Sequence, residues 1–165
     1  MSEQKFNPRF IPKRLYEMVE AVNENTENYQ YFKDSPLFAL FLQYAYDPAK
    51  KLLLPDGTPP YKADESPYPI STGNFNHVMT KLYILLREDL KPIKREQIFI
   101  EMLESINYKE AELLVAISNQ HVELIFPNLS LENMYAAGII QPAGTTEVTL
   151  NKMDGTTVVN YVASV

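Results

Sequence analysis

Apolar residues recur at intervals of three and four positions through most of the chain between residues 13 and 138. This spacing places them on one face of a helix, so it predicts a succession of amphipathic helices. The second predicted helix is apolar nearly all round and is therefore expected in the centre of the core. The predicted helices cover residues of about 13–24, 36–47, 74–88, 92–105, 107–117 and 130–137.

Three local signals mark the ends of these helices. Ser35 followed by Pro36 combines an N-cap oxygen with a proline at the first helical position. Asn107 and Glu110 have the spacing of a capping box, and Gly138 is placed to supply a left-handed C-cap. The inward-facing positions predict one shared core, formed by Leu40, Phe41, Leu82, Leu85, Phe99, Leu103 and Leu114, with Ile93, Ile98 and Met102 on the same helix face as Phe99.

The helical periodicity disappears in the Pro-rich loop, residues 54–73, which carries Pro59, Pro60, Tyr61 and Tyr68. A loop of this length inside a compact domain is uncommon and is often functional. We favour a structural loop whose two tyrosines pack over the helices, because they otherwise expose much apolar surface. The alternative is a Pro-rich ligand for an aromatic groove on a partner.

Polar and apolar residues alternate in the last twenty residues, on either side of an Asp154-Gly155 turn. This pattern predicts a β-hairpin. The expected fold is therefore mainly α: a compact bundle of about five to six helices, with a long Pro-rich loop and a C-terminal β-hairpin. The expected organisation is an extended basic arm at 1–12, a helical domain at 13–138 and a tail with the hairpin at 139–165.

The composition supports a folded chain. The chain has 165 residues, of which 45% are hydrophobic and 22% charged, as expected for one globular domain. It lacks cysteine, a signal-peptide pattern and an apolar run long enough to span a membrane. We therefore expect no disulfides, no membrane association and a cytoplasmic or intraviral location.

Charge is distributed unevenly. The first fourteen residues hold Lys5, Arg9, Lys13 and Arg14 against a single glutamate, whereas the rest of the chain is acidic. An acidic body repels phosphate, which disfavours nucleic acid as a partner. We expect instead that partner proteins contact the apolar residues of the two tails and one cation of the arm, namely Phe6, Arg9, Phe10, Val148, Leu150, Val159 and Tyr161.

The chain has none of the common catalytic motifs. It lacks a nucleophilic cysteine, a G-x-S-x-G elbow, a glycine-rich phosphate loop and an H-E-x-x-H pair. We interpret His77 as a partly buried helix residue, His121 as a loop residue, and Glu101 with Glu104 as a solvated helix face. No catalytic residue, metal or cofactor is therefore predicted.

One basic cluster remains as a candidate anion site. Arg87, Lys91, Lys94 and Arg95 surround the predicted start of a helix, where the helix dipole favours an anion. The alternative is a solvated turn whose charge is balanced by neighbouring acidic residues, and we favour that alternative.

Three segments carry a family resemblance: LLLPDGTPPY at 52–61, KREQIFIEMLE at 94–104 and KEAELL at 109–114. Their order and spacing resemble those of small uncharacterised proteins of tailed bacteriophages, of contractile-tailed and marine types, whose pattern runs LLPEGTPPY, KRExFIxMLE and EAELL. The resemblance covers about residues 13–135, and the arm and the hairpin depart from it. It implies a phage origin, and hence a location in the virion or the host cytoplasm, but no known activity.

These observations favour a non-enzymatic interaction protein of a phage. It is expected to act as a structural or assembly component of the virion and to bind other phage proteins or further copies of itself through its arm and hairpin. The alternative is an intracellular regulator that acts on nucleic-acid machinery through the basic helix start. An enzyme without a common motif is the least favoured reading.

Overall fold

The computed structural model describes residues 11–71 and 73–140, and within this part the chain is helical, with no strand. Residues 1–10 of the arm and residues 141–165 of the tail, which contain the predicted hairpin, lie outside the described residues. The α-helices are α1 (Leu15–Glu24), α2 (Pro36–Tyr46), α3 (Phe75–Met79), α4 (Pro92–Ser105), α5 (Tyr108–Asn119) and α6 (Leu131–Ala136). Short 3₁₀ helices connect them: η2 (Thr26–Tyr31), η3 (Pro48–Lys50), η4 (Leu82–Leu86), η5 (Val122–Leu124) and η6 (Pro127–Leu129).

The predicted helix ends are confirmed where a side chain supplies a local cap. The Ser35 hydroxyl accepts a hydrogen bond from the Phe38 N–H at the start of α2. Asn107 and Glu110 form the capping box of α5. Gly138 follows α6 with a φ of 74°, the left-handed conformation that glycine adopts without a steric penalty.

The single helix predicted over residues 74–88 is wrong, because the structure divides it into α3 and η4. The Thr80 hydroxyl donates a 2.6 Å hydrogen bond to the His77 carbonyl at the end of α3. Such a side-chain bond competes with the main-chain bonds of a regular helix. Lys81 then leaves the helical conformation, with φ −110° and ψ 3°, before η4 begins.

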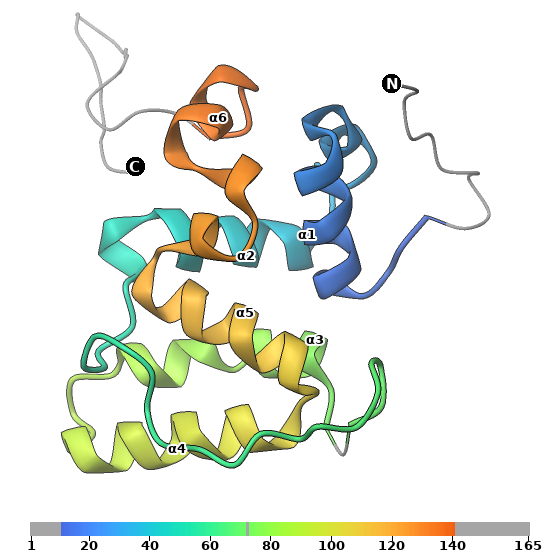
Figure 1. The fold of residues 1–165 in the computed structure, drawn as a ribbon. Helices are drawn as coiled ribbons and strands as arrows, with labels where there is room; N and C mark the ends of the chain where they lie inside the picture. Colours follow the sequence, from blue (N-terminus) through green and yellow to red (C-terminus); the bar gives the residue numbers. More distant parts are fainter. Residues whose placement is uncertain (1–10, 72, 141–165) are drawn as a thin grey trace, which may run out of the picture.

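Helices α2 and α5 pack against each other in the middle of the domain (Figure 1). Helix α4 packs against α5, while α1 packs against both α2 and α3. Figure 1 shows α1 and α6 on one side of this central pair and α3 and α4 on the other. The Pro-rich loop, drawn in teal to green in Figure 1, passes α4 and is hydrogen-bonded to both α4 and α5.

The core contains six of the seven predicted residues in buried positions: Phe41, Leu82, Leu85, Phe99, Leu103 and Leu114. The seventh, Leu40, is half-buried at the edge of the same cluster. Ile93 was predicted to face inward and is instead 72% exposed, because only the later turns of α4 reach the core. His77, predicted to be partly buried, is also exposed.

Aromatic rings connect α2 to its neighbours. The Phe38 ring stacks on Phe32 and touches Phe41, with ring centroids 5.9 and 5.3 Å apart. Tyr46 meets Phe41 edge-on, and its hydroxyl donates a 2.7 Å hydrogen bond to the Leu129 carbonyl. This bond joins the end of α2 to η6 across 83 residues of sequence. No helix in the described ranges is long and apolar enough to cross a membrane.

Two substitutions in α4 test this packing. Phe99 is 3% exposed, so Phe99→Ala should lower the free energy of unfolding by about 3–5 kcal/mol through lost burial and a residual cavity. Ile93→Ala on the same helix is the matched control and should change it by less than about 0.5 kcal/mol. Thermal and urea denaturation measure both, and an equal loss in the two variants would contradict the orientation of α4.

Candidate functional site

The Pro-rich loop is anchored at its C-terminal part by Asn107, the N-cap residue of α5. The Asn107 side chain is fully buried and donates hydrogen bonds to the Ser66 carbonyl (2.8 Å) and the Ile70 carbonyl (3.0 Å). The Tyr108 N–H donates to the Asp64 carbonyl at 3.0 Å, beside the same anchor. Three main-chain carbonyls of the loop are therefore satisfied by the first residues of α5.

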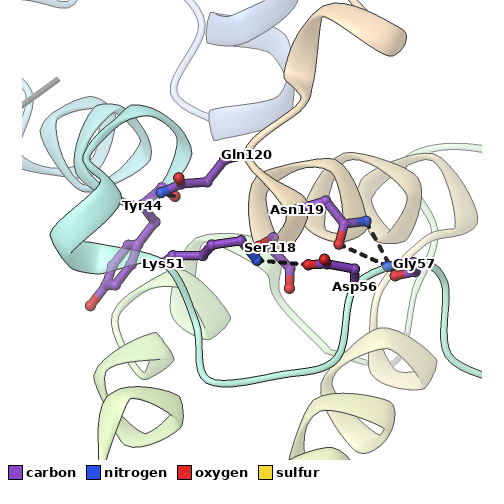
Figure 2. Close-up of polar contacts among 7 residues, drawn as sticks. All are labelled: Tyr44, Lys51, Asp56, Gly57, Ser118, Asn119 and Gln120. Carbon is purple, nitrogen blue, oxygen red and sulfur yellow. Dashed lines mark hydrogen bonds and ion pairs between the residues drawn. The ribbon is translucent and has the colours of Figure 1, made fainter.

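The N-terminal part of the loop is anchored at the other end of α5 (Figure 2). Asn119 makes a reciprocal pair with the Gly57 main chain: its Oδ1 accepts from the Gly57 N–H at 3.0 Å and its Nδ2 donates to the Gly57 carbonyl at 3.2 Å. Lys51 Nζ lies 3.1 Å from the Asp56 carboxylate and 3.4 Å from the Ser118 carbonyl. Gly57 has a φ of 101°, which an L side chain rarely adopts.

Gln120 fixes the end of α5 to the end of α2. It adopts the left-handed conformation, with φ 57° and ψ 42°, although it is not a glycine. Its Nε2 donates to the Tyr44 carbonyl at 3.1 Å and to the Asp47 carbonyl at 2.8 Å. These two bonds offset the local strain and hold α5 and α2 in one arrangement.

The two tyrosines of the loop are half-buried against the helices, as the structural alternative requires. The Tyr68 hydroxyl donates to Glu17 at 3.1 Å, and its ring lies 5.3 Å from the Tyr16 ring. Burial, followed by the Glu17 carboxylate, raises the pKa of Tyr68 above its ordinary value. Between the tyrosines, the Lys62 N–H donates to the Glu104 carboxylate at 2.8 Å. The loop is thus held along its length as well as at both ends.

An open groove of about 580 Å³ lies between this loop, α5 and η5. Most of its exposed lining is apolar. Leu124 stands at its edge with 80% of its surface exposed, the highest value among the large apolar residues of the described chain. The lining residues include Tyr61, Val115, Leu124 and Ile125 on the apolar side and Lys51, Asp56, Glu112 and His121 on the polar side.

The groove has an acidic edge. Lys51 is paired with Asp56, and His121 lies 3.2 Å from Glu123. Glu112 is exposed and makes no salt bridge with another residue of the described chain. Burial, and after it the Glu112 carboxylate, raises the pKa of the Tyr61 hydroxyl. The arrangement therefore favours an apolar ligand that carries positive charge.

The four predicted anion-binding residues differ in the contacts that they make. Arg87 makes a two-point contact with Asp89, at 3.0 and 2.6 Å. The Arg95 guanidinium donates to the carbonyls of Leu53, Arg87 and Leu90 and so joins the loop to the start of α4. Lys91 and Lys94 are exposed beside them. Two of the four cations, Arg87 and Arg95, thus serve local structure, and the anion site stays a prediction.

Sequence reasoning missed the groove. Its two informative residues are Leu124, which follows the end of α5, and Glu112, which lies on the exposed face of that helix. The only signal in the sequence was Leu124, a leucine outside any predicted helical face.

The predicted partner-binding residues of the arm and the tail lie outside the described residues. They are Phe6, Arg9, Phe10, Val148, Leu150, Val159 and Tyr161. Within residues 11–71 and 73–140 no three His, Asp or Glu side chains are placed to hold a metal ion.

The structure defines a class: a small helical domain whose long loop is tied along its central helix and borders an open groove. A model of a "Family of unknown function (DUF6433)" matches residues 16–124, from α1 to the last residue of η5. This match covers more than half of the chain, so the chain belongs to that family. It includes Asn107, the whole loop and Leu124. No curated protein and no solved structure matches the chain.

Replacing Asn107 should weaken the fold and the loop together. Asn107→Ala removes a helix cap and leaves the Ser66 and Ile70 carbonyls without their donor, so the free energy of unfolding should fall by about 2–4 kcal/mol. Asn107→Asp keeps the capping oxygen but not the donor, and it should lose less. Urea denaturation measures both variants, and wild-type stability in Asn107→Ala would show that the loop needs no such anchor.

Trypsin tests whether the loop is held in solution. Lys62 is exposed, but its main chain is fixed by Glu104 and by the flanking tyrosines, so the native chain should be cut there slowly. Asn107→Asp should accelerate this cut by about tenfold, because loss of one to two kcal/mol of anchoring raises the open population. Mass spectrometry of the fragments identifies the site. Early cleavage at Lys62 in the native chain would instead support the Pro-rich-ligand alternative.

Proposed function

We propose that this chain is a phage-encoded interaction protein without enzymatic activity, which serves as a structural or assembly component of the virion. The phage origin rests on the resemblance of the loop, α4 and α5 segments to proteins of tailed phages. Its partners are other phage proteins or further copies of itself. Its place is the virion, or the host cytoplasm during assembly.

One observation carries the protein-binding role: a preformed apolar groove with an almost fully exposed leucine at its edge. Exposed apolar surface with a polar rim is typical of protein-interaction sites. Leu124 is 80% exposed, while Tyr61, Val115 and Ile125 line the space next to it. The groove is framed by anchored main chain, so a partner segment can bind without ordering the loop first.

The two tails supply further contacts in this proposal. Phe6 and Phe10 stand in a basic segment, and the predicted hairpin offers strand edges to which a partner can add main-chain hydrogen bonds. The nucleic-acid alternative is the weaker one. It needs several free cations at one helix start, and Arg87 and Arg95 are engaged in local contacts there.

Mass spectrometry of purified particles of the phage that encodes the chain tests the virion role. A structural component should be present at a fixed stoichiometric copy number relative to the other virion proteins. Its absence from the particles would remove the virion role.

Affinity purification of the tagged full chain from infected cells tests the groove. Leu124→Ser should reduce recovery of the partner by about tenfold or more, as expected for truncation of an apolar anchor. Ile93→Ser, at a 72% exposed position outside the groove, is the matched control and should leave recovery unchanged. Equal recovery with both variants would place the partner elsewhere on the chain.

A further inference from the structure

We infer that the groove is the docking site of residues 1–10 of the chain's own N-terminal arm, so that a partner segment must displace the arm in order to bind. The inference rests on the proposed protein-binding function of the groove and adds its regulation. The proposed occupant belongs to the same chain. Finding a second copy or a foreign segment in the groove instead would overturn the inference.

The arm and the groove are complementary in chemistry. In an extended peptide, residues four positions apart lie on the same side, so Phe6 and Phe10 can face one surface while Lys5 and Arg9 face away from them. The groove offers an apolar wall for the rings, including Val115 and Ile125. Lys5 and Arg9 then lie on the other side of the arm from the apolar wall, and their long side chains can extend to the acidic edge of the groove.

The surroundings of the groove favour a cationic occupant. From residue 97 to residue 140 the chain carries six glutamates, one lysine (Lys109) and no arginine. Glu112 is exposed on the groove and has no salt-bridge partner in the described chain. The cation that does line the groove, Lys51, is already paired with Asp56. The arm is the most basic segment outside the described residues, so it supplies the missing charge.

The described residues that directly follow the arm lie near the groove. Tyr16, in the first turn of α1, has its ring centroid 5.8 Å from that of Phe126, and Phe126 follows the groove residue Ile125. The Glu112 carboxylate is close enough to contribute, after burial and Glu20, to raising the pKa of Tyr16 to about 12. Ile11 packs against the same core. Ten extended residues span up to ~33 Å, so the arm is long enough to reach the groove from there.

Tethering decides between the chain's own arm and the arm of a second copy. A short flexible connection gives an intramolecular segment an effective concentration in the millimolar range. At micromolar protein the chain's own arm therefore occupies the groove before another molecule can. A partner succeeds only by binding the groove more tightly or by binding the arm itself.

Engineered cysteines test the contact, because the chain contains no cysteine of its own. Asn7→Cys, which keeps both rings of the arm, is paired with Thr58→Cys, an exposed residue that lines the groove. The matched control pairs Asn7→Cys with Gln97→Cys, an exposed residue of α4 outside the groove. Both full-length variants are oxidised at low micromolar concentration, and non-reducing electrophoresis separates internal from intermolecular disulfides.

The groove pair should form an internal disulfide at least about tenfold faster than the control pair, as expected for a tethered contact. Adding Glu112→Lys and Leu124→Ser to the groove pair should remove this advantage, and raising the salt concentration should reduce it. Equal rates in the two pairs would overturn the inference. Disulfides formed mainly between two molecules would also overturn it, in favour of a second copy.

A peptide of residues 1–12 with a fluorescent label gives a second measurement. A full-length variant with Phe6→Ser, Arg9→Ser and Phe10→Ser should bind the peptide saturably, whereas the wild-type chain should bind it at least about tenfold more weakly because its own arm occupies the groove. Equal binding by both chains, or binding by neither, would overturn the inference. If Leu124→Ser still abolishes partner recovery in that case, the proposed function stands without this regulation.

Discussion

The arrangement of the loop depends on one buried amide, that of Asn107. Its oxygen accepts the Lys109 N–H and starts α5, while its nitrogen satisfies the Ser66 and Ile70 carbonyls. The Asn107 side chain is buried, and a buried polar group without a partner costs about 1–3 kcal/mol, so departure of the loop would leave the amide nitrogen without both of its acceptors. Few side chains combine an acceptor and two donors in this small volume. Aspartate lacks the donors, and serine is too short to reach two carbonyls.

Helix α5 is thereby the frame of the candidate site. Asn107 ties the loop to its start, and Asn119 ties the loop to its end. Gln120 then ties that same end to α2. The last residue of the loop, Gly73, lies against the end of α4. A Cβ at this position would lie 2.7 Å from the Ser105 carbonyl oxygen, so only glycine allows the chain to pass α4 this closely. The groove exists because the loop is held beside α5 without closing over it.

Local chemistry was predictable from the sequence, and contacts between distant segments were not. The caps at Ser35 and Asn107 and the turn at Gly138 involve residues within four positions, so their spacing is visible in the chain. The break at Thr80 was missed because apolar periodicity continues through it, while the main-chain bonds there join residues three apart and the Thr80 hydroxyl donates to the His77 carbonyl. Ile93 followed the period of α4, but the helix extends past the core at that end. The carbonyls that accept hydrogen bonds from Arg95 lie 5, 8 and 42 residues away in the sequence. The spacing of apolar residues cannot predict such bonds.

The groove combines features that would be unfavourable in a purely structural surface. A leucine that is 80% exposed contributes little to the stability of the isolated domain, and exposed apolar surface favours nonspecific association. Its anchored frame, in contrast, is fixed by hydrogen bonds at both ends of one helix: two offset the strain of the left-handed Gln120, and others satisfy the buried Asn107. Fixing the frame in advance lowers the conformational entropy lost when a segment binds. A rigid frame beside exposed apolar surface fits the proposed binding role, and the exposed Glu112 carboxylate favours an occupant that carries positive charge.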